Sequence, residues 1–216
     1  MYVDVKYEKT EELFFDNMKP VLELRIIWPV IEGNITKKAE YNFNSFYLEN
    51  AKTANKFVRT EFFPKAKIHC SECRKSGFPF NVHSFIRETK TAYSDCQYLS
   101  AVTDTYLFNG GIHGIHTKFA KTWDLQTGTS THLRAFFRKG FNYRKYIISS
   151  VIRQIEQIKN EKKDIFYPNA QYLAAKNFSA AGWYVSGINE ITFFYPEYVI
   201  ASHTAGIIEF KIPMLK

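Results

Sequence analysis

The stretch Asn109-Gly110-Gly111-Ile112-His113-Gly114 says more about the fold than any other part of the sequence. It follows the apolar run Tyr106-Leu107-Phe108 and precedes residues 115–125, where polar and apolar side chains alternate. Glycine adopts positive φ without steric cost, so Gly110 and Gly111 predict a tight turn between two antiparallel strands, with His113 at the loop tip. We therefore expect Gly111→Val to harm folding more than His113→Ala.

The strand pattern extends in both directions from this turn. A second hairpin-like turn is predicted at Thr127-Gly128. Apolar and alternating segments predict further strands at residues 21–30, 78–89, 93–108, 182–185, 190–195 and 207–212. Residues 1–19 are charged and show little pattern beyond Leu13-Phe14-Phe15, which predicts an arm or a short edge element.

Two substantial helices interrupt the strands. Apolar side chains recur at helical spacing between residues 35 and 62 and again from about residue 142 to residue 160. Pro168 permits a short third helix that ends near Lys176. Strands that come in runs with two main helices predict an α+β fold with antiparallel sheets rather than a doubly wound parallel sheet.

The length of 216 residues suits one large domain or two small domains that share an interface. We expect two intimately associated subdomains, a smaller N-terminal one over residues 1–100 and a C-terminal one over residues 101–216. The sequence has no Gly/Ser-rich or Pro-rich linker between them. The strands on either side of the boundary should therefore pack together.

The formal charge is +8, but lysine and arginine are spread along the chain and accompany no recognised nucleic-acid motif. This argues against a nucleic-acid partner, while the same positive field suits a polyanionic cell-wall polymer. Every apolar run is interrupted well before the roughly 20 residues that a membrane-spanning helix needs. The N-terminal residues lack the apolar centre and cleavage site of a secretory signal, so we expect a cytoplasmic protein unless a leader or anchor has been removed.

Three cysteines leave at least one thiol unpaired within a monomer. Cys70 and Cys73 have the spacing of zinc and redox motifs, and His69, His83 and Cys96 could complete a tetrahedral set. A second matched pair is missing, which favours ordinary thiols. A local disulfide and a metal site remain as alternatives.

Several short motifs occur in an order that resembles a bacterial family of unknown-function domains. They are Gly110-Gly111-Ile112-His113-Gly114, Asp124-Leu125-Gln126-Thr127-Gly128, Leu133-Arg134-Ala135-Phe136-Phe137 and, after a helix, Ala201-Ser202-His203-Thr204-Ala205-Gly206-Ile207. Members of that family form the extracytoplasmic part of RsiV-type anti-sigma factors, which bind lysozyme, and a non-catalytic region ahead of the catalytic domain of some peptidoglycan deacetylases. The resemblance covers residues 106–213. A weaker likeness to the smaller domain that usually precedes it covers residues 22–99, through Ile27-Trp28-Pro29-Val30-Ile31-Glu32-Gly33.

Three histidines fall in these motifs. His113 and His116 flank Gly114-Ile115, and His203 lies in the last motif. If the two loops converge, the three imidazoles could contact a ligand, hold a metal or act as acid and base. The alternative is that His113 only locks the turn through a hydrogen bond. The candidate ligand-binding residues are Gly110, Gly111, His113, His116 and His203.

Catalysis is not predicted, because the sequence shows no nucleophile elbow, phosphate-binding loop or dinucleotide fingerprint. We accordingly assign no catalytic residue, metal ligand or cofactor. The leading hypothesis is a non-catalytic recognition module that binds a protein or cell-wall ligand through the loops around residues 110–116 and 196–206, in envelope sensing and outside the cytoplasm by resemblance. The alternatives are a metal-dependent hydrolase that uses the loop histidines, and a cytoplasmic structural or regulatory protein that retains the fold.

Overall fold

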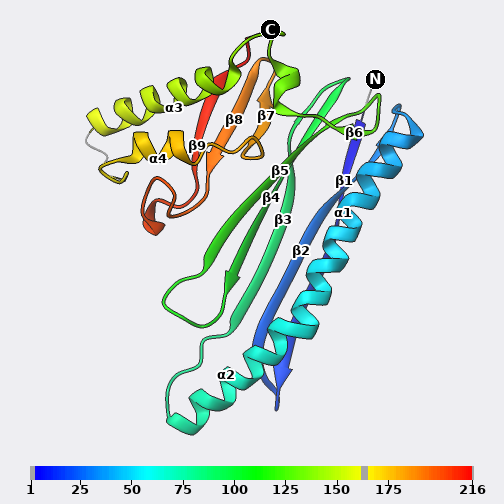
Figure 1. Ribbon diagram of the computed structural model, residues 1–216. Helices are drawn as coiled ribbons and strands as arrows, with labels where there is room; N and C mark the ends of the chain where they lie inside the picture. The colour runs from blue at the N-terminus through cyan, green and yellow to red at the C-terminus, as the bar shows by residue number, and fades with distance from the viewer. Residues whose placement is uncertain (1–2, 162–164, 216) are drawn as a thin grey trace.

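The computed structural model describes residues 3–161 and 165–215 and has the predicted α+β fold, with two packed subdomains (Figure 1). The larger sheet has the strand order β1-β2-β3-β4-β5-β6 and the smaller sheet the order β7-β8-β9. The strands are Val3–Asp16 (β1), Lys19–Gly33 (β2), His83–Ser94 (β3), Tyr98–Phe108 (β4), Ile115–Asp124 (β5), Thr129–Ser130 (β6), Trp183–Gly187 (β7), Glu190–Tyr195 (β8) and Ile208–Pro213 (β9). The α-helices are Lys37–Phe57 (α1), Phe63–Ser76 (α2), Tyr143–Asn160 (α3) and Ala170–Lys176 (α4).

The N-terminal residues form a long strand, β1, rather than the short element predicted. β1 pairs with β2 along its whole length through a hairpin turn at Asn17 and Met18, whose φ angles are 48° and 63°. The turn contains no glycine, so it lacks the usual sequence signal of a tight hairpin. β1 is an edge strand with many Lys and Glu side chains, and this charge protects its free edge from pairing with other chains.

The first predicted helix is present and extends beyond its predicted end at residue 62. The π-helical turn Val58–Phe62 joins α1 to α2, and Pro64 stands in the first turn of α2. Proline lacks the N–H that a continuous α-helix would use, and the wider turn before it carries the chain past that gap. The helix returns the chain so that β3 pairs with β2 in parallel, while the neighbouring pairs β1–β2, β3–β4 and β4–β5 are antiparallel.

Helix α1 packs on one face of the larger sheet. The apolar contacts there include Phe43 and Tyr47 of α1 and Leu99 and Trp123 of the sheet, all at least nine-tenths buried. Thr36 caps the helix by accepting a hydrogen bond from the Ala39 N–H at 3.1 Å. Because Leu99 and Trp123 face α1 and side chains alternate along a strand, the odd-numbered residues of β4 and β5 face α1 and the even-numbered residues face the opposite side.

The smaller sheet packs on that opposite side. Ser100 and Thr122 share a buried hydrogen bond of 2.6 Å, and the Val185 N–H of β7 donates to the Ser100 hydroxyl at 3.1 Å. Val102 and Phe194 pack together next to this bond. The boundary predicted near residue 100 lies inside β4, in the middle of the larger sheet. The division into residues 1–100 and 101–216 stays a prediction, and the larger sheet continues across it.

Helix α3 covers the outer face of the smaller sheet, and its side chains Ile147, Val151 and Ile155 are fully buried there. The structure begins this helix at the cap residue Asn142, as predicted. The three short C-terminal strands and α4 also occur where the sequence predicts them. No helix in the described residues is both long and apolar enough to cross a membrane.

Candidate functional site

Two loops that are distant in the sequence meet beside the smaller sheet. One connects β4 to β5 over residues 109–114, and the other follows β8 over residues 196–207 (Figure 1). The rings of His113 and His203 stack with their centroids 3.9 Å apart and an angle of 25° between their planes. Two of the predicted site residues are therefore in direct contact. Whether they bind a ligand stays a prediction.

Tyr198 extends this ring cluster. Its ring is nearly parallel to His203, with centroids 5.6 Å apart and an interplanar angle of 17°. Tyr198 has a φ of 63°, which is strained for a bulky side chain, and it is 53% exposed. Ile112, next to His113, is fully exposed. The loops thus present aromatic rings and an isoleucine to solvent, and we call His113, His203, Tyr198 and Ile112 the loop patch.

The buried carboxylate of Glu197 positions residues of the two loops. Its side chain is only 4% exposed, and Oε2 lies 3.2 Å from Nδ1 of His203 and accepts from the His116 N–H at 3.4 Å. This contact holds the Nδ1 edge of the His203 ring against Glu197. The buried Oε1 of Glu197 has no hydrogen-bond partner among the described residues. This carboxylate therefore fixes the position of His203.

The His116 side chain does not join the ring cluster. It packs against Tyr106, with centroids 4.6 Å apart, and contributes to the site through its backbone N–H. The Tyr106 ring also covers Gly114, where an added Cβ would stand 2.1 Å from Tyr106 Cε2. Gly114 is thus required by the close approach of an aromatic ring, and not by its φ.

The glycine turn differs from the prediction in one respect. Gly110 has a φ of 83°, whereas Gly111 lies outside the left-handed region. Gly110 packs against the histidine pair His69 and His83, since an added Cβ would stand 2.7 Å from His69 Cε1. The expectation that Gly111→Val is the damaging substitution because of positive φ is therefore wrong, and the residue with positive φ is Gly110.

We expect Gly110→Ala to lower the free energy of unfolding by about 2 kcal/mol, because alanine at positive φ is strained and its methyl group meets His69. Gly111→Ala should change it by less than about 0.5 kcal/mol, because the new Cβ would meet only Asn109 Oδ1, at 3.3 Å. Urea unfolding of both variants checks this order. A larger loss at Gly111 would contradict it.

The stacked geometry limits the chemistry of the loop patch. Ring nitrogens lie in the planes of their rings, so two nearly parallel imidazoles direct them side by side rather than toward one point. In the described part of the chain, no group of three or more His, Cys, Asp or Glu is placed to hold a metal ion. Cys70 and Cys73 are buried free thiols on α2, and Cys96 is an exposed one.

The candidate residues chosen from the sequence do not include Glu197, Tyr198 or Tyr106, although the first two lie in the predicted binding loop of residues 196–206. Glu197 and Tyr198 follow Pro196 directly after the apolar strand β8, and a buried acid at such a position leaves no periodic signal. Their proximity to His203 in the sequence was the only available sign. Tyr106 reads as an ordinary strand residue, and its role depends on a register that only the structure provides.

Comparison with known proteins identifies two regions in the chain. Residues 16–116 match the family Deacetylase PdaC, and residues 134–214 match the Protein of unknown function DUF3298. The chain is thus similar to a PdaC-type region followed by a DUF3298 region, which confirms the predicted resemblance to a bacterial family of unknown-function domains found with deacetylases. No curated protein matches the sequence significantly.

Two solved structures share the fold. The chain is similar to a DUF3298 family member from Bacteroides fragilis, with a TM-score of 0.70 and 17% identity over 98% of this chain and 90% of that one. It is also similar to a DUF3298 family protein from Pseudomonas aeruginosa PAO1, with a TM-score of 0.57 and 13% identity over the same shares of the two chains. At these identities the likeness shows the architecture and no particular activity.

Proposed function

From the pairing of a PdaC-type region with a DUF3298 region, we propose that this chain is a non-catalytic recognition module that binds a protein or cell-wall ligand through the loop patch. The observation that carries the proposal is the ring cluster of His113, His203 and Tyr198, which the buried Glu197 holds in place. Backbone strain at an exposed aromatic residue such as Tyr198 is typical of a functional site.

The patch has the features of a small recognition surface. Exposed tyrosine and isoleucine side chains supply contact area, and the ring nitrogens of the histidines add directional hydrogen bonds. The net charge of +8 would attract an anionic wall polymer or an acidic protein surface. The resemblance to lysozyme-binding anti-sigma factors and to deacetylase regions supports an extracytoplasmic role in envelope sensing. Stacked histidines support a contact surface better than they support the metal-dependent hydrolase.

The test compares Ile112→Asp with Ile188→Asp. Ile112 is fully exposed in the loop patch, while Ile188 is 78% exposed in the turn between β7 and β8, at the other end of β8 from Pro196. Both substitutions exchange an exposed isoleucine for the same charge. We expect Ile112→Asp to weaken binding at least tenfold and Ile188→Asp to leave it unchanged.

Two ligands are measured, insoluble peptidoglycan by co-sedimentation and immobilised lysozyme by interferometry. Binding of one of them that depends on Ile112 supports the proposal and identifies the ligand class. Binding that is equally sensitive to Ile188→Asp, or no binding to either ligand, contradicts it. Stoichiometric zinc in the purified protein would favour the hydrolase instead.

A further inference from the structure

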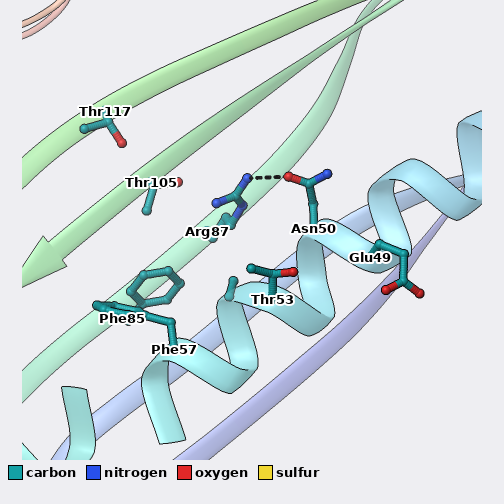
Figure 2. Close-up of a pocket in the computed structure, with 9 residues that line it drawn as sticks. Glu49, Asn50, Thr53, Phe57, Phe85, Arg87, Thr105 and Thr117 are labelled. Carbon is teal, nitrogen blue, oxygen red and sulfur yellow. Dashed lines mark hydrogen bonds between the residues drawn. The ribbon is translucent and has the colours of Figure 1, made fainter. Parts of the chain in front are cut away.

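A cavity of about 370 Å³ lies on the face of the larger sheet that α1 covers, away from the smaller sheet (Figure 2). Helix α1 supplies one wall, and strands β3, β4 and β5 supply the floor. Ile115 and Phe119 of β5 lie on this face and are exposed, so α1 does not cover the whole of it.

The polar groups of the floor form a row across three strands. Arg87 of β3 pairs in register with Thr105 of β4, which pairs with Thr117 of β5. Side chains directly opposite each other in neighbouring strands point to the same face, so the guanidinium and two hydroxyls line one side of the cavity. Asn50 faces this row from α1 (Figure 2).

Arg87 lacks a counter-ion in this half-buried position. Its Nη2 donates to Asn50 Oδ1 at 3.4 Å, and no carboxylate of the described residues lies within ion-pair distance of it. Glu49 is the acid nearest in the lining, but its carboxylate points away from Arg87 (Figure 2) and pairs with Lys52 Nζ at 2.8 Å. By contrast, Arg25, Arg59 and Arg74 each face a carboxylate.

The electrostatic consequence can be compared with that of another half-buried cation. Burial lowers the pKa of Arg87, with no nearby acid to oppose it. Burial also acts on Lys118, but Asp104 at 2.7 Å and Glu209 at 3.3 Å bring its pKa above the ordinary value. Arg87 is therefore a desolvated cation whose missing partner is an anion.

The lining selects among anions. Arg87 is the one cation among the lining residues, and three threonines and an asparagine add neutral hydrogen-bonding groups. A single guanidinium matches a carboxylate through two parallel hydrogen bonds, whereas a doubly charged phosphate would leave one charge uncompensated. Phe57, Phe85 and Ala54 form the apolar remainder, and the volume fits a group about the size of one or two amino-acid residues.

We propose that this cavity binds the carboxylate of a small ligand, with Arg87 as the anchoring cation and with the apolar part of the ligand against Phe57 and Phe85. The ligand is either a free organic acid or the C-terminal residue of a peptide. This site lies on the opposite face of β5 from His116, and it does not depend on the loop patch.

The test uses N-acetyl-L-phenylalanine as the probe and its uncharged amide as the matched analogue, titrated into the full chain and followed by NMR. The acid should bind and the amide should bind at least tenfold more weakly. Arg87→Gln should weaken binding of the acid at least tenfold. Arg153→Gln, which removes an exposed arginine from α3, should leave this binding unchanged. Ile112→Asp should also have no effect.

Further measurements keep the test decisive. If Arg87→Gln fails to fold, Thr53→Trp on the exposed surface of α1 should fill the cavity and abolish binding with the charge intact. A tetrapeptide that ends in phenylalanine distinguishes the sources, because tighter binding than the free acid indicates a peptide C-terminus and equal binding indicates an organic acid. Equal binding of acid and amide, undiminished binding to Arg87→Gln, or no binding of acid and peptide overturns the proposal.

Discussion

Gly128→Ala is expected to lower the free energy of unfolding by about 4 kcal/mol. Gly128 has a φ of 69°, which is strained for alanine, and a Cβ there would stand 2.8 Å from the backbone nitrogen of Ala39 and 2.9 Å from its Cα. Backbone atoms at the start of a helix cannot move aside as the end of a long side chain can. The turn predicted from the sequence at Thr127-Gly128 therefore also packs directly against the first turn of α1.

The surrounding hydrogen bonds explain why the destabilisation by Gly128→Ala should extend beyond the turn. Asn42 of α1 donates to the Gly128 carbonyl at 2.8 Å, and the Thr36 hydroxyl donates to the Leu125 carbonyl at 3.4 Å. Pushing α1 away from the turn would break both bonds and loosen the packing of Phe43 on Trp123. The effect should appear as a lower unfolding midpoint in urea, with a similar dependence on urea concentration.

Gly140→Ala is the matched control. Gly140 has a φ of 82°, but a Cβ there would meet nothing within 4 Å. Both substitutions carry the strain of positive φ, and only Gly128→Ala adds the backbone collision. We expect Gly140→Ala to cost about 1 kcal/mol. Equal losses in the two variants would show that the contact with α1 does not matter.

The elements that the sequence predicted well are those with a strong periodic pattern. The apolar stripe Ile147, Val151 and Ile155 located α3 because a helix on a sheet must bury one face. The short strands β8 and β9 were found by their dense apolar and β-branched content. In these segments local pattern and tertiary packing agree, so the sequence is sufficient.

The segments that were misjudged are those in which tertiary contacts override local signals. β1 and the hairpin at Asn17 and Met18 depend on pairing with β2, and the helix predicted to end at residue 62 continues through a π-helical turn into α2. The predicted strands at residues 78–89 and 93–108 are shifted to β3 and β4. Helix α2 continues to Ser76 and delays the start of β3 to His83, and Asp95 Oδ1 accepts from the N–H groups of Gln97 and Tyr98 in the turn that separates the two strands.

The site was predictable only in part. The glycine-rich loop and the histidine motif mark exposed turns, and their meeting was a stated condition that the structure fulfils for His113 and His203. Glu197 and Arg87 could not be identified, because the importance of each depends on burial. A glutamate or arginine in a sequence is read as a surface residue, and only packing shows that it is buried.

Lowering the pH should destabilise the protein through His83. This side chain is 3% exposed, its Nε2 lies 2.9 Å from Nδ1 of His69, and its own Nδ1 has no partner among the described residues. Burial, followed by the charge of His69, lowers the pKa of His83 from 6.5 to about 4. His83 therefore remains neutral in the folded protein at pH values where the unfolded chain has taken up a proton.

This difference determines the pH range of the effect. Above pH 6.5, His83 is neutral in both the folded and the unfolded state, so it does not change the free energy of unfolding. As the pH falls from 6.5 to 4, the unfolded state binds a proton that the folded state excludes, so the free energy of unfolding decreases by up to about 3 kcal/mol. Below pH 4 both states bind the proton, and the contribution of His83 no longer changes.

His83→Phe isolates this contribution, because phenylalanine can pack between Phe62 and Phe80 and does not titrate. Carboxylates also bind protons near pH 4, so the informative quantity is the difference between wild type and variant. Urea unfolding at pH 7, 6, 5 and 4 should show the wild type losing about 3 kcal/mol more than His83→Phe. His132→Gln, which replaces an exposed histidine, should follow the wild type. Parallel pH profiles for wild type and His83→Phe would mean that His83 takes up its proton in the folded protein as readily as in the unfolded chain.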